Sequence, residues 1–323
     1  MARLAFFGTP EFSLPALEKA ARFAHEHGHN LVLVVTQPDA RQGRGKILSA
    51  PAVKKKAQSL GISVYQPTSL RKNTSDGDEF FRVFTDAHID LAIVVAYGNI
   101  IPQRFLSASR LGFVNIHGSL LPRFRGAAPV QRALEAGDLE TGVCLMDMVL
   151  KLDEGDILAE RKTPIVASDT SHTLFRRLSY LGAQLLYDNL DNLLHQRLKK
   201  IPQGPEGILY ASMLSKSEGA YNHDCPSKLI AHRARAFDPW PRLFGYINNR
   251  RVMLFDSFYI LTKKHKDKAV GTIVVLGDFL GIRAVDGIVY FQSMQFEGKN
   301  RLPIKEALIS SAIKIGDSIQ STF

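Results

Sequence analysis

The alternation of short apolar runs with helix-like segments constrains the fold of this chain more than any other feature. Apolar runs occupy residues 3–7, 31–36, 63–65, 91–98 and 111–117. Between them, polar and apolar residues mix at helical spacing, over 14–28, near 51–60 and near 78–87. This pattern predicts parallel βαβ units in an α/β sheet with helices on both faces. Ligands of such sheets bind at the carboxyl ends of the strands.

Two further regions extend this picture beyond residue 140. Residues 142–166 predict two more strands around a turn at Asp153 to Asp156, and they extend the sheet in mixed orientation. A helix is expected over 170–195, with Asp169 and Thr170 as candidate caps.

The remaining residues favour a second domain. Residues 196–212 are rich in proline and glycine without periodicity, and we interpret them as a linker. After a helix near 226–236, residues 213–323 carry short strands bounded by glycine, aspartate and asparagine, which is typical of a small β-barrel. The domains are therefore predicted to be 1–195, the linker 196–212 and the barrel 213–323.

Composition limits the classes of function. With 45% hydrophobic and 22% charged residues, the 323-residue chain is expected to be globular. No apolar run approaches the roughly 20 residues of a membrane span, and the two cysteines do not form a disulfide framework, so a cytoplasmic protein without membrane contact is expected. The net charge is +10, and residues 213–323 contribute +6 of it, with 16 Lys+Arg against 10 Asp+Glu. This excess favours a phosphate-rich partner such as nucleic acid, although a solvated basic surface accounts for charge alone equally well.

One short motif lies where the sheet is expected to bind its ligand. The apolar run 111–114 ends in NIHGSLLPRFRGAAP, in which Asn115 and His117 are two positions apart. Because side chains alternate along a strand, these two point to the same side while Ile116 points into the opposite layer. The turn at Asp153 follows a neighbouring strand, so its carboxylate can reach the same edge. An isolated Asn-x-His pair can also be no more than two satisfied polar groups at a strand end.

The residue types in this trio point to a class of chemistry. We find neither a serine or cysteine in a nucleophile elbow nor the ligand spacing of a metal site, so covalent catalysis and a metal centre are both disfavoured. An amide and an imidazole can stabilise the oxyanion that develops when an external nucleophile attacks a carbonyl, and a carboxylate can orient the imidazole. Acyl or formyl transfer is the implied reaction class.

These residues, with several other motifs, resemble a known family. The string NIHGSLLPRFRGAAP occurs together with GTPEF near the start, TQPD followed by GRGK, VVAYG at 94–98, LDEGDIL at 152–158 and AFDPWP at 236–241. Over nearly the whole chain this set is similar to the 10-formyltetrahydrofolate-dependent formyltransferases, and the GRGK loop, RGAAP and the barrel resemble the branch that formylates methionyl-tRNA. The resemblance implies a Rossmann-like formyltransferase domain with a mostly parallel sheet, followed by a small OB-like β-barrel that binds tRNA.

The resemblance also implies roles for individual residues. Asn115, His117 and Asp153 match the catalytic residues of the family. The nearby carboxylate of Asp156 does not match a catalytic residue. Arg44 matches an arginine that positions the charged acceptor end of the tRNA. The segment matching the tetrahydrofolate-binding residues is Ser119, Leu120, Leu121 and Pro122. Lys151 and Glu154 depart from the family pattern beside Asp153, where glycine and a small residue are usual. Cys144 stands where serine or threonine is expected and is interpreted as a core residue.

The implied reaction joins two substrates. The free amino group of methionine on initiator methionyl-tRNA attacks the formyl carbon of the co-substrate 10-formyltetrahydrofolate, with no metal, in a protein expected to be a monomer. An alternative is a formyltransferase acting on an amino sugar nucleotide or another small amine, against which the basic barrel argues. A dinucleotide-binding dehydrogenase is disfavoured because FFGTPEF lacks GxGxxG. A non-catalytic RNA-binding protein would leave the convergence of Asn115, His117 and Asp153 unexplained.

Overall fold

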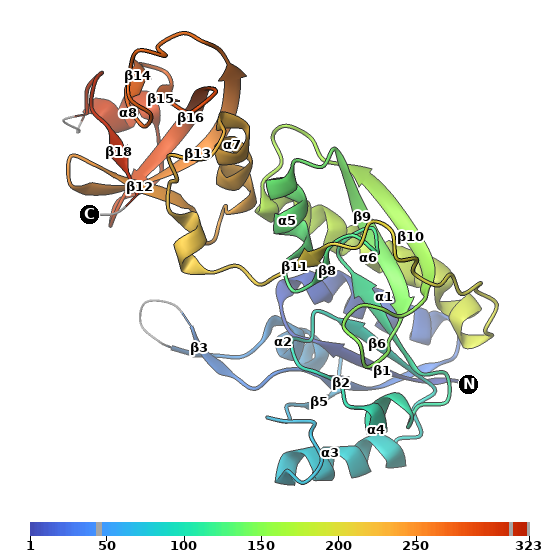
Figure 1. Ribbon diagram of the computed structural model, residues 1–323. Helices are drawn as coiled ribbons and strands as arrows, with labels where there is room; N and C mark the ends of the chain where they lie inside the picture. Colours follow the sequence, from blue (N-terminus) through green and yellow to red (C-terminus); the bar gives the residue numbers. More distant parts are fainter. Residues whose placement is uncertain (43–46, 310–312, 322–323) are drawn as a thin grey trace. The chain divides into compact units, whose positions relative to one another are not determined.

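The computed structural model describes residues 1–42, 47–309 and 313–321, and these form two compact units. The first unit comprises 1–126, 141–163 and 175–210; the second comprises 127–140, 164–174 and 211–323. Each unit is assembled from segments that are distant in the sequence (Figure 1). The predicted boundaries at 195/196 and 212/213 stay a prediction.

The first unit is built on a seven-stranded sheet. Its strands are β1 (Arg3–Gly8), β2 (Asn30–Val35), β5 (Ser63–Tyr65), β6 (Leu91–Val95), β7 (Phe113–His117), β9 (Glu140–Asp147) and β10 (Ile157–Pro164). They lie in the order β10-β9-β7-β6-β1-β2-β5. β1 runs parallel to β2 and β6, and β6 runs parallel to β7, whereas β9 pairs with β7 in the antiparallel sense. The predicted mostly parallel sheet with a mixed edge is confirmed.

Helices connect the parallel strands, and a long helix follows β10, as the sequence pattern predicts. They are α1 (Leu14–Glu26), α2 (Ala52–Ser59), α3 (Ser75–Asp86), α4 (Gln103–Leu106) and α6 (Ser171–Leu194), with a 3₁₀ turn η1 (Glu11–Ser13) before α1. A short hairpin, β3 (Ala40–Gln42) with β4 (Ile47–Ser49), projects after β2 (Figure 1). This hairpin is not predicted from the sequence pattern.

The helices pack against the two faces of the sheet in different ways. On one side the ring of Phe7 meets the rings of Phe80, Phe84 and Phe113 at centroid distances of 5.4–6.5 Å. On the other side α6 approaches β7 closely, because Gly182 has no side chain: a Cβ there would lie 2.7 Å from Cγ2 of Ile116. Ile116 therefore points into the helical layer, as the alternation predicts.

The second unit is an antiparallel barrel-like sheet with helices. The sheet strands are β14 (Ile273–Leu276), β15 (Leu280–Arg283), β16 (Gly287–Phe296), β13 (Arg250–Leu261), β12 (Leu243–Ile247) and β18 (Ile319–Gln320), hydrogen-bonded in that order, and β17 (Leu302–Pro303) pairs with β16. Its helices include α5 (Pro129–Ala136), α7 (Ser227–Ala236) and α8 (Ile304–Ile309). α5 packs on α7, and α7 packs on β13. The predicted small barrel is confirmed, and the apolar core beneath it includes Val252, Leu254, Ile282 and Phe291.

The last regular elements are β8 (Arg125–Gly126), β11 (Tyr210–Ala211) and a 3₁₀ turn η2 (Lys216–Gly219). Within the part of the chain that the structure describes, no helix combines the length and the apolar character that crossing a bilayer requires.

Candidate active site

Asn115 and His117 end strand β7 at the carboxyl edge of the sheet. Asn115 lies opposite Met146 and His117 lies opposite Cys144 on the antiparallel neighbour β9, so all four side chains share one face. His117 is 5% exposed, while Asn115 is half-buried. Among the hydrogen bonds of residues 1–42, 47–309 and 313–321, none engages the side-chain amide of Asn115. This amide is therefore available to a substrate.

The imidazole of His117 is held from two sides. Its Nε2 lies 2.8 Å from the carbonyl oxygen of Phe124, and its Nδ1 lies 3.6 Å from Oδ2 of Asp153. Because a carbonyl oxygen only accepts hydrogen bonds, Nε2 carries a proton and donates it. Nδ1 then faces the carboxylate of Asp153. Asn115, His117 and Asp153 are predicted from the sequence to lie at one edge, and the structure places the last two side by side.

The carboxylate of Asp153 is positioned by its own backbone and by the loop that follows β7. Asp153 has a φ of 52°, a left-handed conformation that aspartate tolerates better than most residues, and the amide of Gly126 donates a hydrogen bond of 2.8 Å to Oδ2. The turn closes tightly, because a Cβ on Gly155 would lie 1.8 Å from the carbonyl oxygen of Asp147. A glycine is thus required two residues after the carboxylate.

Gln203, which no sequence motif singles out, fastens this turn. Its side-chain amide donates to the carbonyl oxygens of Asp153 at 2.8 Å and Gly155 at 2.7 Å, and its oxygen accepts from Nε of Arg125 at 3.0 Å. Arg125 is 5% exposed and also pairs with Glu154 at 3.3 Å. Gln203 lies in the segment interpreted as a linker, where nothing in the local sequence marks it as a contact of the turn.

The two departures from the family pattern beside Asp153 pair with each other. Nζ of Lys151 lies 3.5 Å from Oε2 of Glu154, at the exposed surface of the turn. Since Glu154 also contacts Arg125, the pair closes the outer side of the turn and leaves the carboxylate of Asp153 directed toward His117.

The segment from Ser119 to Pro122 forms a closed turn above β9. The hydroxyl of Ser119 donates to the carbonyl oxygen of Arg123 at 2.6 Å, and the amide of Leu121 donates to Sγ of Cys144 at 3.4 Å. The side chain of Leu120 lies over Gly142, where an added Cβ would be 2.6 Å from its Cδ2. Leu121 joins Cys144, Met146 and Ile157 in a small apolar cluster. These four side chains are at most 9% exposed, so the cluster anchors the turn to the sheet on the face that carries Asn115 and His117.

Cys144 belongs to the packing of the site. It is completely buried, and burial raises the pKa of its thiol to about 12. The thiol therefore remains protonated at neutral pH and is no nucleophile, in agreement with its interpretation as a core residue.

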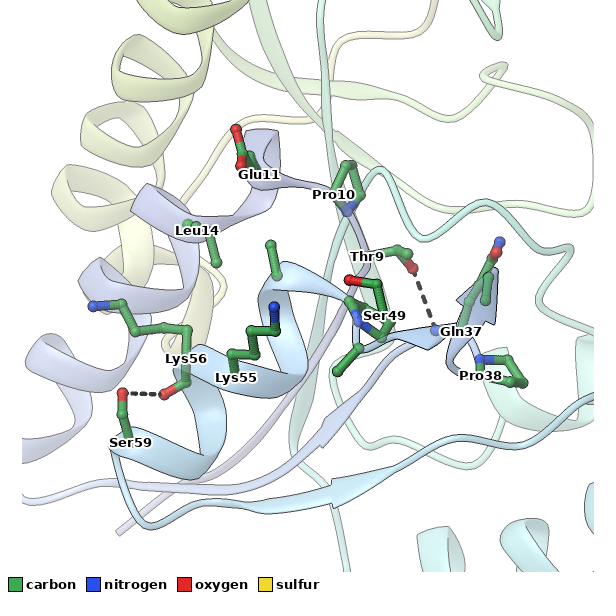
Figure 2. A pocket seen from close by; sticks show the side chains of 14 residues that line it. Thr9, Pro10, Glu11, Leu14, Gln37, Pro38, Ser49, Lys55, Lys56 and Ser59 are labelled. Atoms are coloured by element: carbon green, nitrogen blue, oxygen red, sulfur yellow. Dashed lines mark hydrogen bonds between the residues drawn. The ribbon is translucent and has the colours of Figure 1, made fainter. Parts of the chain in front are cut away.

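A cavity of about 750 Å³ lies at the ends of β1 and β2, between the start of α1 and helix α2. Figure 2 shows Thr9, Gln37 and Lys55 along its walls. Thr9 Oγ1 and Gln37 Nε2 donate to the carbonyl oxygen of Tyr97, at 2.8 and 3.1 Å, so the cavity wall is tied to the loop that follows β6. Since β6 lies between β1 and β7, this cavity and the Asn115–His117 pair occupy the same edge of the sheet. The catalytic candidates themselves do not line it.

Two further sequence predictions concern the loop of Arg44 and a metal site. Arg44 and the GRGK motif lie outside the described residues. In the described ranges, no group of three or more His, Cys, Asp or Glu side chains is arranged to hold a metal ion.

Comparison with known proteins identifies relatives over the full chain. Residues 2–190 match the family described as Formyl transferase, and residues 213–311 match Formyl transferase, C-terminal domain. A methionyl-tRNA formyltransferase of Alcanivorax borkumensis is 38% identical over 98% of this chain and 96% of its own length. The enzyme of the same name from Burkholderia pseudomallei is 40% identical over 97% of this chain and 96% of its own length.

Solved structures share the fold at lower identity. An N-formyltransferase of Helicobacter canadensis, in complex with folinic acid and dTDP-3-aminofucose, matches with a TM-score of 0.65 and 17% identity over 90% of this chain and 99% of its own. HypX of Aquifex aeolicus, in complex with tetrahydrofolic acid, matches with a TM-score of 0.61 and 17% identity over 99% of this chain and 49% of its own. Together with the sheet and the residues at its carboxyl edge, the two matched regions show that this chain belongs to the formyl transferase family.

Proposed function

We propose that this protein transfers the formyl group of 10-formyltetrahydrofolate to the free amino group of methionine on initiator methionyl-tRNA. The full-length relatives at 38–40% identity carry the name of that activity and support the assignment. The observation that carries the chemistry is the convergence of a free amide, an imidazole and a carboxylate on one sheet edge, with His117 Nδ1 3.6 Å from Asp153.

Each of the three side chains has a role in the attack of an amine on a formyl carbon. Negative charge develops on the formyl oxygen as the amine adds, and the Asn115 amide is the donor that stabilises it. His117 supplies positive electrostatic support and exchanges a proton at Nδ1, since Nε2 is engaged by the Phe124 carbonyl. Asp153 orients the imidazole, supports its charge and relays the proton released by the amine to N10 of the folate, as the bond between N10 and the formyl carbon breaks and tetrahydrofolate leaves.

The chain offers a fitting surface for the folate co-substrate, which supplies the activated formyl group. The Ser119–Pro122 turn and the apolar cluster of Leu121, Cys144, Met146 and Ile157 lie on the face of Asn115 and His117. The cluster is at most 9% exposed and holds the turn in place, and the backbone of the turn offers hydrogen bonds to an aromatic heterocycle. We therefore assign Ser119, Leu120, Leu121 and Pro122 to the folate. HypX of Aquifex aeolicus, which shares the fold, was crystallised with tetrahydrofolic acid, and this supports a folate ligand.

The acceptor is assigned to tRNA because of charge as well as relatedness. Residues 213–323 carry a net charge of +6, which suits a polyanion and serves no purpose for a small amine. Arg44 keeps its proposed role at the acceptor end of the tRNA. An amino sugar nucleotide remains the second candidate, because the fold is shared with an enzyme crystallised with dTDP-3-aminofucose.

A direct comparison of acceptors tests this proposal. Purified protein is given 10-formyltetrahydrofolate with methionyl initiator tRNA, with an amino sugar nucleotide or with glycinamide ribonucleotide, and formyl transfer is followed by mass spectrometry. Transfer to the charged tRNA alone is expected. Transfer to a small amine alone would keep the site chemistry and overturn the acceptor, and no transfer to any of the three would overturn the assignment of the site.

A further inference from the structure

Three aromatic side chains gather on the outer face of the second unit's sheet, away from its core. The rings of Phe258 on β13 and Tyr290 on β16 are stacked, with centroids 4.8 Å apart and planes 6° from parallel. Phe279, in the turn between β14 and β15, meets both rings edge-on at 5.4 and 6.5 Å. We call these three residues the aromatic platform.

The strand pairing shows that the aromatic platform faces outward. Phe258 lies opposite Tyr290, and Tyr290 lies opposite Gly281 on β15. The neighbours of these residues along the strands, Val289, Phe291 and Ile282, point into the apolar core, so the aromatic residues occupy the opposite face. Gly281 has little room for a side chain, since a Cβ there would lie 2.8 Å from Cβ of Val275 and 3.1 Å from Cε1 of Tyr290. The aromatic ring therefore lies over a bare backbone.

Packing alone does not explain these residues. The outward face of an antiparallel sheet that buries its other face is normally polar. Here Phe258 and Tyr290 are half-buried, Phe279 is 37% exposed, and the neighbouring Ile260 on the same face is 47% exposed. Apolar surface that stays in contact with water does not stabilise the fold. A bound ligand that covers the platform explains these exposed apolar side chains better than packing does.

The border of the platform is basic. β13 continues into a hairpin tip that carries Lys263, Lys264, Lys266 and Lys268, of which only Lys268 forms an ion pair, with Asp267 at 3.4 Å, in the described residues. Arg283 lies on the platform's face, 9% exposed; its Nε donates to the carbonyl oxygen of His265 at 3.2 Å, and its Nη1 has no partner in the described residues. This hydrogen bond fixes the base of the basic tip beside the aromatic rings.

The acidic side chains near the platform already have partners. Asp278, next to Phe279, lies 3.9 Å from Lys305, and Asp286 accepts a hydrogen bond of 2.8 Å from the amide of Ser227. Asp286 keeps its negative charge, because its partner is a neutral amide. Set against Asp267 and Asp286, the four lysines of the tip and Arg283 still leave the border positively charged, which suits a ligand that combines flat apolar groups with negative charge. Unpaired nucleotides of an RNA have both properties, because each base presents a π-face and each linkage a phosphate.

We propose that the aromatic platform stacks unpaired nucleobases of an RNA, while the lysines of the 263–268 tip contact the flanking phosphates. Phe279, the most exposed of the three rings, is the outermost stacking surface. The inference adds to the proposed function a stacking contact for single-stranded nucleotides of the RNA partner, and it rests on that function only for the identity of the natural RNA.

The test uses the full chain and a fluorescein-labelled decauridylate, with fluorescence anisotropy at several KCl concentrations. Phe279→Ala and Phe279→Leu are expected to weaken binding about five- to tenfold, and Phe279→Trp to strengthen it, because base stacking needs an aromatic face. The slope of log Kd against log salt should not change in these variants. In contrast, Lys263→Gln, Lys264→Gln and Lys266→Gln combined should reduce that slope by about 2, at about 0.7 per phosphate contact.

Matched controls separate stacking from general surface effects. Tyr180→Ala removes another exposed aromatic ring, 63% exposed on α6, and should leave the oligonucleotide affinity unchanged. Phe279→Leu with wild-type affinity, or a loss in Tyr180→Ala equal to that in Phe279→Ala, would overturn the proposal. So would tighter binding of a ten-base-pair RNA duplex than of the single strand.

The proposed function is assayed separately. If the wild-type protein fails to formylate methionyl-tRNA yet binds decauridylate through Phe279, the catalytic assignment fails while the platform stands. If the wild-type protein formylates methionyl-tRNA but Phe279→Leu and Phe279→Ala bind decauridylate as well as the wild type, the platform proposal fails while the catalytic assignment stands.

Discussion

At the scale of single residues, the free amide of Asn115 leads to the sharpest prediction. Asn115→Ala removes the proposed oxyanion donor and should lower kcat about a hundredfold or more, with little change in KM. Because Asn115 is half-buried and its amide has no hydrogen bond in the described part of the chain, the melting temperature should stay close to that of the wild type. Steady-state kinetics and calorimetry measure both, and near-normal turnover would remove Asn115 from the catalytic group.

The turn at 153–156 contains its own control. Asp153→Asn keeps an oxygen that can accept the Gly126 amide but removes the negative charge beside His117, so kcat should fall by more than about tenfold. Asp156→Asn changes a carboxylate in the same turn that does not contact the imidazole, and it should retain nearly full activity. Equal losses in the two variants would show that the turn's overall charge matters and that Asp153 has no special role.

The buried thiol of Cys144 can be tested without catalysis. With a pKa of about 12, only about one thiol in ten thousand is ionised at pH 8, and reaction with a thiol reagent should be very slow. In a Cys225→Ser background, in which Cys144 is the sole cysteine, native protein is expected to stay unmodified over minutes, whereas protein unfolded in guanidinium reacts at once. Rapid modification of the native protein would show that the site opens.

The sequence anticipated part of this site for a physical reason. Asn115 and His117 could be predicted because strand alternation is local and fixes which side chains share a face. The hydrogen bonds of Gln203 to the turn at Asp153 depend on a contact between residues 50 positions apart, and no periodicity encodes such a contact. Likewise, Phe124, whose carbonyl oxygen accepts the hydrogen bond from His117, has a left-handed φ of 59°. Bulky aromatic residues rarely adopt this conformation, so the sequence does not predict it.

At the scale of elements, the helices and parallel strands of the first unit follow from the apolar pattern, whereas short hairpins do not. The βαβ alternation, the mixed edge formed by β9 and the long α6 were all predicted and are confirmed. The β3–β4 hairpin was missed, because its three-residue strands are too short for any alternation to be recognised.

The close approach of α6 to β7 depends on Gly182. Gly182→Leu would place a side chain where a Cβ already lies 2.7 Å from Ile116, and overpacking of this kind costs about 1–3 kcal/mol of unfolding free energy. Tyr180→Leu, at an exposed position on the same helix, is the matched control and should change stability little. Denaturant unfolding measures both, and equal stability of the two variants would contradict the proposed packing.

At the scale of the whole molecule, the net charge sets an expectation for the proposed binding of tRNA. With a charge of +10 overall, affinity for tRNA should fall steeply as salt rises, because bound phosphates release counterions, with a slope near about −0.9 for each duplex phosphate contacted. Filter binding with uncharged initiator tRNA between about 50 and 200 mM KCl measures this slope. An affinity that does not change over this range would exclude the basic surface as the binding surface.

The assignment of α5 to the second unit has a consequence for synthesis on the ribosome. The apolar side of α5, with Val130, Ala133 and Leu134 buried, packs on α7, which begins about 90 residues later in the chain. At about 5–20 residues per second, α5 emerges roughly 5–20 seconds before its partner has been made. During translation the apolar side of this short helix therefore stays exposed while the first unit around it in the sequence folds. We expect a chaperone that binds nascent chains to bind at this segment.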